Sequence, residues 1–105
     1  MTNLKSFVST KMKMTAIYQP VIIKVLLENN GSASYSTIAD ELVKLDSSKP
    51  HSFYIDRLAV HPRTVLATHE VASVEKKVYK LEASYTDANE IILILNNKIA
   101  QFMSK

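Results

Sequence analysis

One segment in the second half of the chain combines the residue types that read DNA bases. Residues 62–69 are expected to form a helix with Arg63, Thr64 and Thr68 on one face, and that face contains no acid. An arginine can pair bidentately with guanine, and threonine hydroxyls bond to several base edges. This face therefore predicts contact with the major groove of double-stranded DNA.

Lysines gather in a second place, immediately after this segment. Residues 71–73 and 78–82 are rich in β-formers and indicate two strands around 74–77, which together form a hairpin. Its lysines are suited to neutralising phosphates or entering the minor groove, and they are Lys76, Lys77 and Lys80. Two lysines near the N-terminus, Lys11 and Lys13, are candidates for further contacts with the DNA backbone.

Catalysis has no comparable support. The three histidines lack a Cys, Asp or His partner at ligand spacing, and they are His51, His61 and His69. We expect His69 to lean inward as a packing residue and His61, before a proline, to act as a helix cap or a phosphate neighbour. With Gly31 as its only glycine, the chain has no phosphate-cradling loop. The sequence predicts a non-enzymatic protein without cofactor or metal.

Length, composition and net charge indicate the class of protein. A chain of 105 residues with 47% apolar residues suits one globular domain. Its net charge of +3 is mild, but basic zones in 1–27 and 51–81 flank a more acidic one. Neither a signal peptide nor a run of membrane-spanning length is present, and cysteine is absent. We expect a cytoplasmic protein with no membrane partner.

The elements that must position these side chains are organised around residues 18–30. Apolar residues at helical spacing cover most of this segment, and Pro20 suits the first turn of a helix. Asn30 and Gly31 form a stop signal. A helix apolar on most sides must be covered by the other elements.

The remaining periodicities predict the rest of the chain. A helix at 3–14 is joined to the central one through Thr15 and Ala16, and residues 32–34 form a short connection to a helix at 35–45 with Ser34 as N-cap. Residues 52–60 favour a short helix, although their composition also suits a strand. A last helix spans 86–103, with Thr86 as N-cap. Its expected packing stripe is Ala88, Ile92, Leu95, Ile99, Phe102 and Met103.

This order of elements is typical of a mainly α protein with a small β-hairpin, an α+β fold. It matches a winged helix-turn-helix with additional N- and C-terminal helices, in which the last helix before the hairpin enters a DNA groove. The predicted recognition helix is 62–69 and the wing is 71–82.

The residues also resemble a known family. The pattern runs from Tyr18-Gln19-Pro20 through Ile38-Ala39 to Arg63-x-Val65-Leu66-x-x-His69 and Tyr79-x-Leu81. Over residues 4–103 it is similar to the winged-helix-like N-terminal region of bacterial HNH-type restriction endonucleases. The resemblance implies a DNA-binding module for target recognition in restriction-modification. In that family a nuclease domain follows, whereas this sequence ends at Lys105, so binding is carried over and cleavage is not.

Two other functions fit the same pattern. The protein could be an interaction or dimerisation winged helix, an alternative favoured by the modest charge and by the apolar residues Leu4, Phe7 and Val8 near the N-terminus. It could also be a small winged-helix transcriptional regulator. Possible partners are therefore duplex DNA, a C-terminal nuclease domain and a second copy of the chain.

Overall fold

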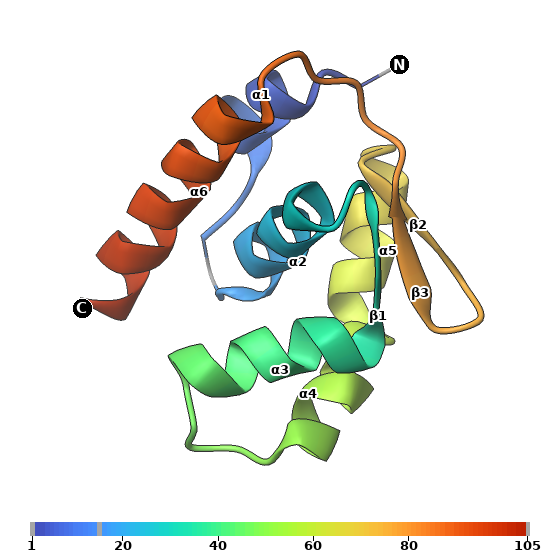
Figure 1. Cartoon of the computed structure of the whole chain (residues 1–105), viewed down its shortest axis with the longest axis vertical. Coiled ribbons are helices and arrows are strands. Elements are labelled where there is room, and N and C mark those ends of the chain that lie inside the picture. The colour runs from blue at the N-terminus through green and yellow to red at the C-terminus, as the bar shows by residue number, and fades with distance from the viewer. Residues whose placement is uncertain (1, 15, 105) are drawn as a thin grey trace.

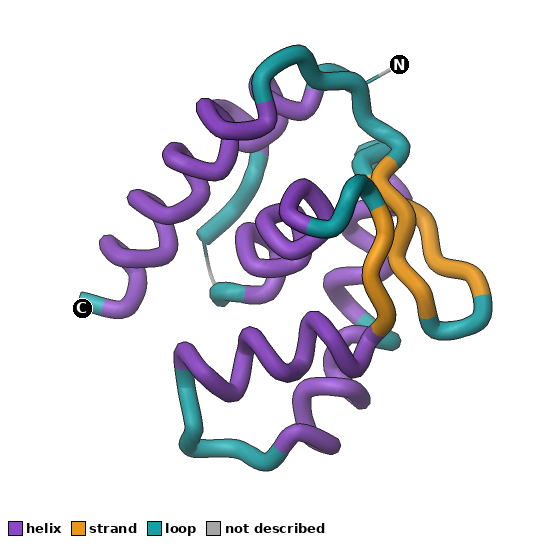
Figure 2. The backbone as a smooth tube through the Cα atoms, in the orientation of Figure 1, coloured by secondary structure: helices purple, strands orange, loops and turns teal. Residues whose placement is uncertain are grey.

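Helices and a small sheet at one side of the molecule make up the computed structural model, which describes residues 2–14 and 16–104 (Figure 1). Figure 2 separates the helices from the strands. The fold is mainly helical with one three-stranded antiparallel sheet, which confirms the expected α+β class. The elements in chain order are α1 (Leu4–Ser6), the π-helix η1 (Phe7–Lys11), α2 (Tyr18–Glu28), β1 (Ser32–Ser34), α3 (Tyr35–Leu45), α4 (His51–Leu58), α5 (His61–Thr68), β2 (Ala72–Glu75), β3 (Val78–Leu81) and α6 (Ala88–Met103).

Helix α2 lies at the centre, between α6 on one side and α3, α5 and the sheet on the other (Figure 1). Seven of its eleven residues are buried, as its apolar circumference requires. It ends at Glu28, two residues earlier than predicted. Asn30 (φ 59°) and Gly31 (φ 97°) then adopt left-handed conformations, and the Gly31 N–H donates to the Leu26 carbonyl at 2.7 Å. The expected stop signal therefore closes the helix by a Schellman-type bond.

The sheet has the order β1-β3-β2. The sequence analysis treated 32–34 as a plain connection, and that was wrong: these residues form the edge strand β1. Ala33 pairs with Tyr79 in β3, while Ser34 also accepts a hydrogen bond from the Thr37 backbone N–H as the N-cap of α3. The three small residues of β1 show no alternation of apolar and polar side chains that would predict a strand. The strand forms because its backbone pairs with β3.

The N-terminal segment is shorter than the predicted helix over 3–14. It ends at Lys11, where the Met12 N–H donates five residues back to the Phe7 carbonyl at 2.8 Å, and Met12 itself is extended. Leu4, Phe7 and Val8 are all buried in the core. Part of the joint to α2, Thr15, lies outside the described residues.

The last helix differs from its prediction in its N-cap residue and in the residues that it buries. Asp87, not Thr86, is the N-cap and accepts from the Glu90 N–H. Ile91 lies in the core with Leu95 and Ile99, whereas Met103 is exposed. Residues 91–95 are apolar without interruption, so helical periodicity alone could not select the buried face.

Candidate nucleic-acid interface

Helix α5 presents the side chains predicted to face DNA. Pro62 and Leu66 are buried and anchor the helix, while Arg63, Thr64 and Thr68 are exposed. The helix spans His61–Thr68, one residue earlier at each end than predicted, so Pro62 occupies its second position. All three candidates thus lie on the outer side of one short helix, and an arginine there has room to reach a base edge.

The start of α5 adds a contact that the sequence analysis missed. Val60, the residue before the helix, is 65% exposed, and its carbonyl accepts from the Thr64 hydroxyl at 3.1 Å. With its proton used in this way, the Thr64 oxygen is left as an acceptor. An exposed valine offers apolar contact to a thymine methyl group. The predicted helix over 52–60 included Val60, whereas α4 ends at Leu58 and Val60 is the N-cap of α5, so helical periodicity gave no sign of its position.

The hairpin places its lysines at a two-residue turn. Strands β2 and β3 pair from Ala72↔Leu81 to Glu75↔Val78, so residues 74 and 75 belong to the strand and only Lys76 and Lys77 form the tip. Both have positive φ, 53° and 62°, which is the geometry of a type I′ turn. Among the described residues, no carboxylate lies within ion-pair distance of either lysine.

A backbone hydrogen bond joins the hairpin tip to the start of helix α3. The Tyr35 N–H at the start of α3 donates to the Lys77 carbonyl at 3.0 Å. Lys80, in contrast, lies along β3 and its Nζ is 3.8 Å from a Glu75 carboxylate oxygen. The structure therefore separates the three predicted lysines into a pair at the tip, without an acidic partner in the described part of the chain, and one lysine on β3 that has one.

A buried tyrosine joins the hairpin to the helices beneath it. The Tyr79 hydroxyl on β3 donates to the Leu58 carbonyl at the end of α4, and its ring lies 5.5 Å from that of Tyr35. Burial raises the pKa of Tyr79, and the positive charge of Arg63 opposes this change. The hydroxyl bond and the ring contact therefore fix β3 against α3 and α4.

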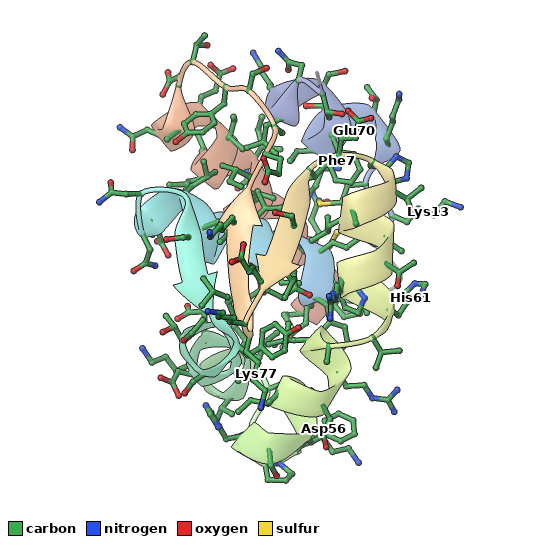
Figure 3. All side chains as sticks on the ribbon, turned by 90° about the vertical axis from the view of Figure 1, so that its right-hand side faces the viewer. Phe7, Lys13, Asp56, His61, Glu70 and Lys77 are labelled. Carbon is green, nitrogen blue, oxygen red and sulfur yellow. The ribbon has the colours of Figure 1, made fainter. Side chains whose placement is uncertain are left out.

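A second basic group lies on the opposite flank of α5. Lys11 and Lys13 line a pocket of about 260 Å³ whose other lining residues are Gln19, His61, Val65 and His69. Figure 3 shows Lys13 and His61 on one side of α5 and Lys77 on the other. The two lysines singled out for backbone contacts thus stand beside the predicted recognition helix, although about fifty residues separate them from it in sequence.

His69 differs from its prediction. It is exposed rather than inward, because it is the C-cap of α5 and lies beyond the last packed turn. Its ring nevertheless packs against buried Phe7, with 5.2 Å between ring centroids. The His69 ring therefore contacts Phe7, and the rest of the side chain is exposed to solvent.

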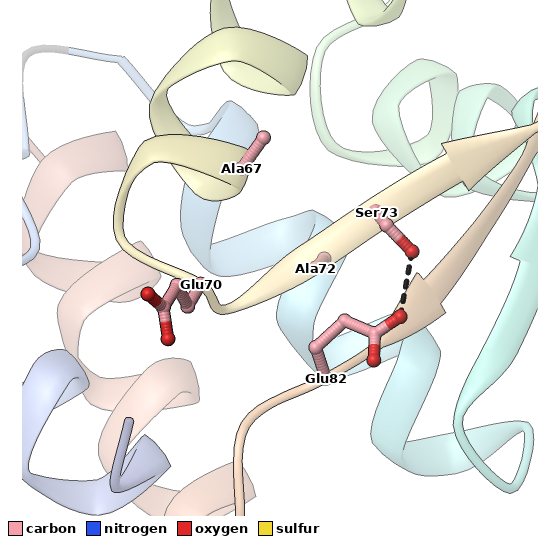
Figure 4. Close-up of a pocket in the computed structure, with 5 residues that line it drawn as sticks. All are labelled: Ala67, Glu70, Ala72, Ser73 and Glu82. Carbon is pink, nitrogen blue, oxygen red and sulfur yellow. Dashed lines mark hydrogen bonds between the residues drawn. The ribbon is translucent and has the colours of Figure 1, made fainter. Parts of the chain in front are cut away.

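The C-terminal end of α5 is acidic. Glu70 and Glu82 line a pocket of about 400 Å³ together with Ala67, Ala72 and Ser73 (Figure 4). The Ser73 hydroxyl donates to a Glu82 carboxylate oxygen at 2.7 Å, and the Glu70 side chain is open to solvent. Two carboxylates repel an anion, so this pocket is electrostatically unfavourable for a phosphate group.

Within the described residues, no three His, Cys, Asp or Glu side chains come close enough to hold a metal ion. The same residues include no helix that is long and apolar enough to cross a membrane. Comparison of the chain with protein-family models, with curated proteins and with solved structures gives no match.

Proposed function

We propose that the protein is a DNA-binding winged helix that recognises a target duplex and is not itself catalytic. One observation carries the proposal: an acid-free face with Arg63, Thr64 and Thr68 is followed directly by a hairpin tipped with Lys76 and Lys77. The order α2-β1-α3, then α5 and the β2-β3 hairpin, with β3 central in the sheet, supports a winged helix in which the short helix α4 is inserted between α3 and α5. The role resembles that of the N-terminal region of HNH-type restriction endonucleases.

The proposal is tested by duplex binding as a function of salt. Phosphate contacts release counterions, so the logarithm of the binding constant should fall linearly with the logarithm of salt concentration. Arg63→Ala should weaken binding to a preferred duplex by about 1–3 kcal/mol and weaken non-specific binding less. Lys44→Gln is the matched control, because Lys44 is exposed near the end of α3 that lies away from the hairpin.

Two results would contradict the proposal. One is an absence of binding to both methylated and unmethylated duplexes at low salt. The other is an equal loss of affinity in the Arg63→Ala and Lys44→Gln variants, since that would indicate general attraction between a basic protein and DNA.

The interaction alternative loses one of the two observations that favoured it, the apolar residues near the N-terminus, and keeps the modest charge. Leu4, Phe7 and Val8 fill the core and form no apolar docking face. Phe7→Asp would place a charge in the core and unfold the protein, so it does not discriminate between the two functions. A transcriptional regulator would use the same DNA contacts, and finding a bound sequence within promoter DNA would favour that role.

A further inference from the structure

The pocket beside α5 has the composition of an anion site. Two lysines from the N-terminal segment and two histidines from the ends of α5 line a volume of about 260 Å³, and its lining includes no carboxylate among the residues that the structure describes. The nearest acid in sequence, Glu70, lines a different pocket with Glu82. Metal binding by histidines is commonly completed by carboxylate or thiolate ligands, whereas lysine ammonium groups are donors suited to phosphate oxygens.

The geometry of the pocket is maintained by its neighbours. Buried Phe7 packs against the His69 ring at 5.2 Å between centroids, and His61 is the first residue of α5. Gln19, from α2, also lines the pocket, and its side-chain oxygen is buried without a hydrogen-bond partner among the described residues.

We infer that Lys11, Lys13, His61 and His69 bind one phosphate group of the DNA backbone, on the flank of α5 opposite the hairpin. This inference rests on the proposed function, because it takes its ligand from DNA. A helix in the major groove lies between two phosphate backbones. The lysine-tipped hairpin would contact one backbone and this pocket the other.

The number of phosphates assigned to the pocket sets the size of its effect on DNA binding. The slope of log K against log salt changes by about 0.9 for each phosphate contact. One phosphate bound in the pocket should therefore account for ~0.9 of the slope, and loss of the pocket should flatten the slope by that amount.

The first experiment tests the pocket without DNA. Imidazole proton resonances of the full chain are followed by NMR at pH 6 while inorganic phosphate is added at constant ionic strength. His61 and His69 should shift, and His51 should not, because it lies outside the pocket with its Nε2 2.9 Å from an Asp40 oxygen. Equal responses from all three histidines, or none, would overturn the site.

Variants link this response to the lysines. Lys11→Gln/Lys13→Gln should abolish the phosphate-induced shifts, and both lysines are exposed, so the fold should be retained. Lys44→Gln/Lys98→Gln removes the same charge from α3 and α6 and should leave the shifts unchanged. A loss of the shifts in both double variants would overturn the inference.

The second experiment measures the salt slope of duplex binding. The slope should flatten by ~0.9 in Lys11→Gln/Lys13→Gln, the amount for one phosphate contact, and should not change in Lys44→Gln/Lys98→Gln. DNA binding that requires Arg63 but ignores Lys11→Gln/Lys13→Gln would overturn the pocket and leave the proposed function intact. A phosphate response without any duplex binding would keep an anion site and overturn DNA as its ligand.

Discussion

Substitution of Lys76 and Lys77 at the hairpin turn should raise the stability of the protein and weaken its binding to DNA. Both residues occupy the left-handed region, which favours asparagine and glycine over lysine in a type I′ turn. Lys76→Asn/Lys77→Gly should therefore stabilise the protein while it removes the two charges assigned to phosphate contact. The hydrogen bond from the Tyr35 N–H to the residue 77 carbonyl is a backbone interaction and should persist.

The size of each effect follows from the turn geometry and the charge count. A left-handed conformation costs an ordinary L-residue roughly 1–2 kcal/mol, and the extra freedom of glycine in the unfolded chain offsets about 0.5–1 kcal/mol. A net gain of about 1 kcal/mol remains, which raises the Tm of a domain of this size by ~4–8 °C. Loss of two phosphate contacts should flatten the salt slope by ~1.8, so that raising salt from about 50 to 200 mM weakens binding about 12-fold less than in the wild type.

The assay pairs a thermal melt with duplex binding at four salt concentrations. Lys76→Arg/Lys77→Arg keeps both charges and the unfavourable turn, so its melting temperature and salt slope should match those of the wild type. A stabilised Asn-Gly variant with an unchanged slope would refute a DNA contact at the hairpin tip. A destabilised variant would refute the turn geometry.

Three further substitutions test the surroundings of the site. Glu70→Gly should raise stability by about 0.5–1 kcal/mol, since Glu70 has φ 58° after α5, and a urea titration measures this. Tyr79→Phe should cost about 1–3 kcal/mol, because it leaves the Leu58 carbonyl without its donor. Because burial raises the pKa of folded Tyr79, the wild type should keep this contribution below about pH 10 and lose stability as pH rises further. Tyr79→Phe should reduce that alkaline loss in melts at pH 9 to 11. Phe7→Asp should lose cooperative unfolding in circular dichroism, because it buries a charge in the core.

The elements that the sequence predicted well are those with local signals. Ser34 caps α3 because its hydroxyl can reach the N–H three residues ahead, and that requires only adjacent residues. Asn30 and Gly31 stop α2 because both tolerate positive φ. Strand β1 has no such signal: its three residues are small, and their conformation is set by pairing with β3, almost fifty residues later.

The same distinction applies to the candidate site. Arg63, Thr64 and Thr68 could be grouped from sequence because helical spacing places them on one face. The lysines at 11 and 13 could not be placed beside His61, since their position depends on where the π-turn at Met12 redirects the chain. Likewise, Glu70 and Glu82 line the same pocket only because β2 and β3 pair.

The distribution of charge along α5 restricts how this helix can meet DNA under the proposed function. Figure 3 shows His61 at one end of α5 and Glu70 at the other. Eight residues span about 12 Å, which is close to the width of the major groove, roughly 12 Å. A helix lying flat across the groove would bring Glu70 and Glu82 against a phosphate backbone, and repulsion opposes that arrangement. Entry by the N-terminal half instead places Arg63 at the bases and leaves both carboxylates outside the groove, as helix-turn-helix proteins use the first residues of their recognition helix.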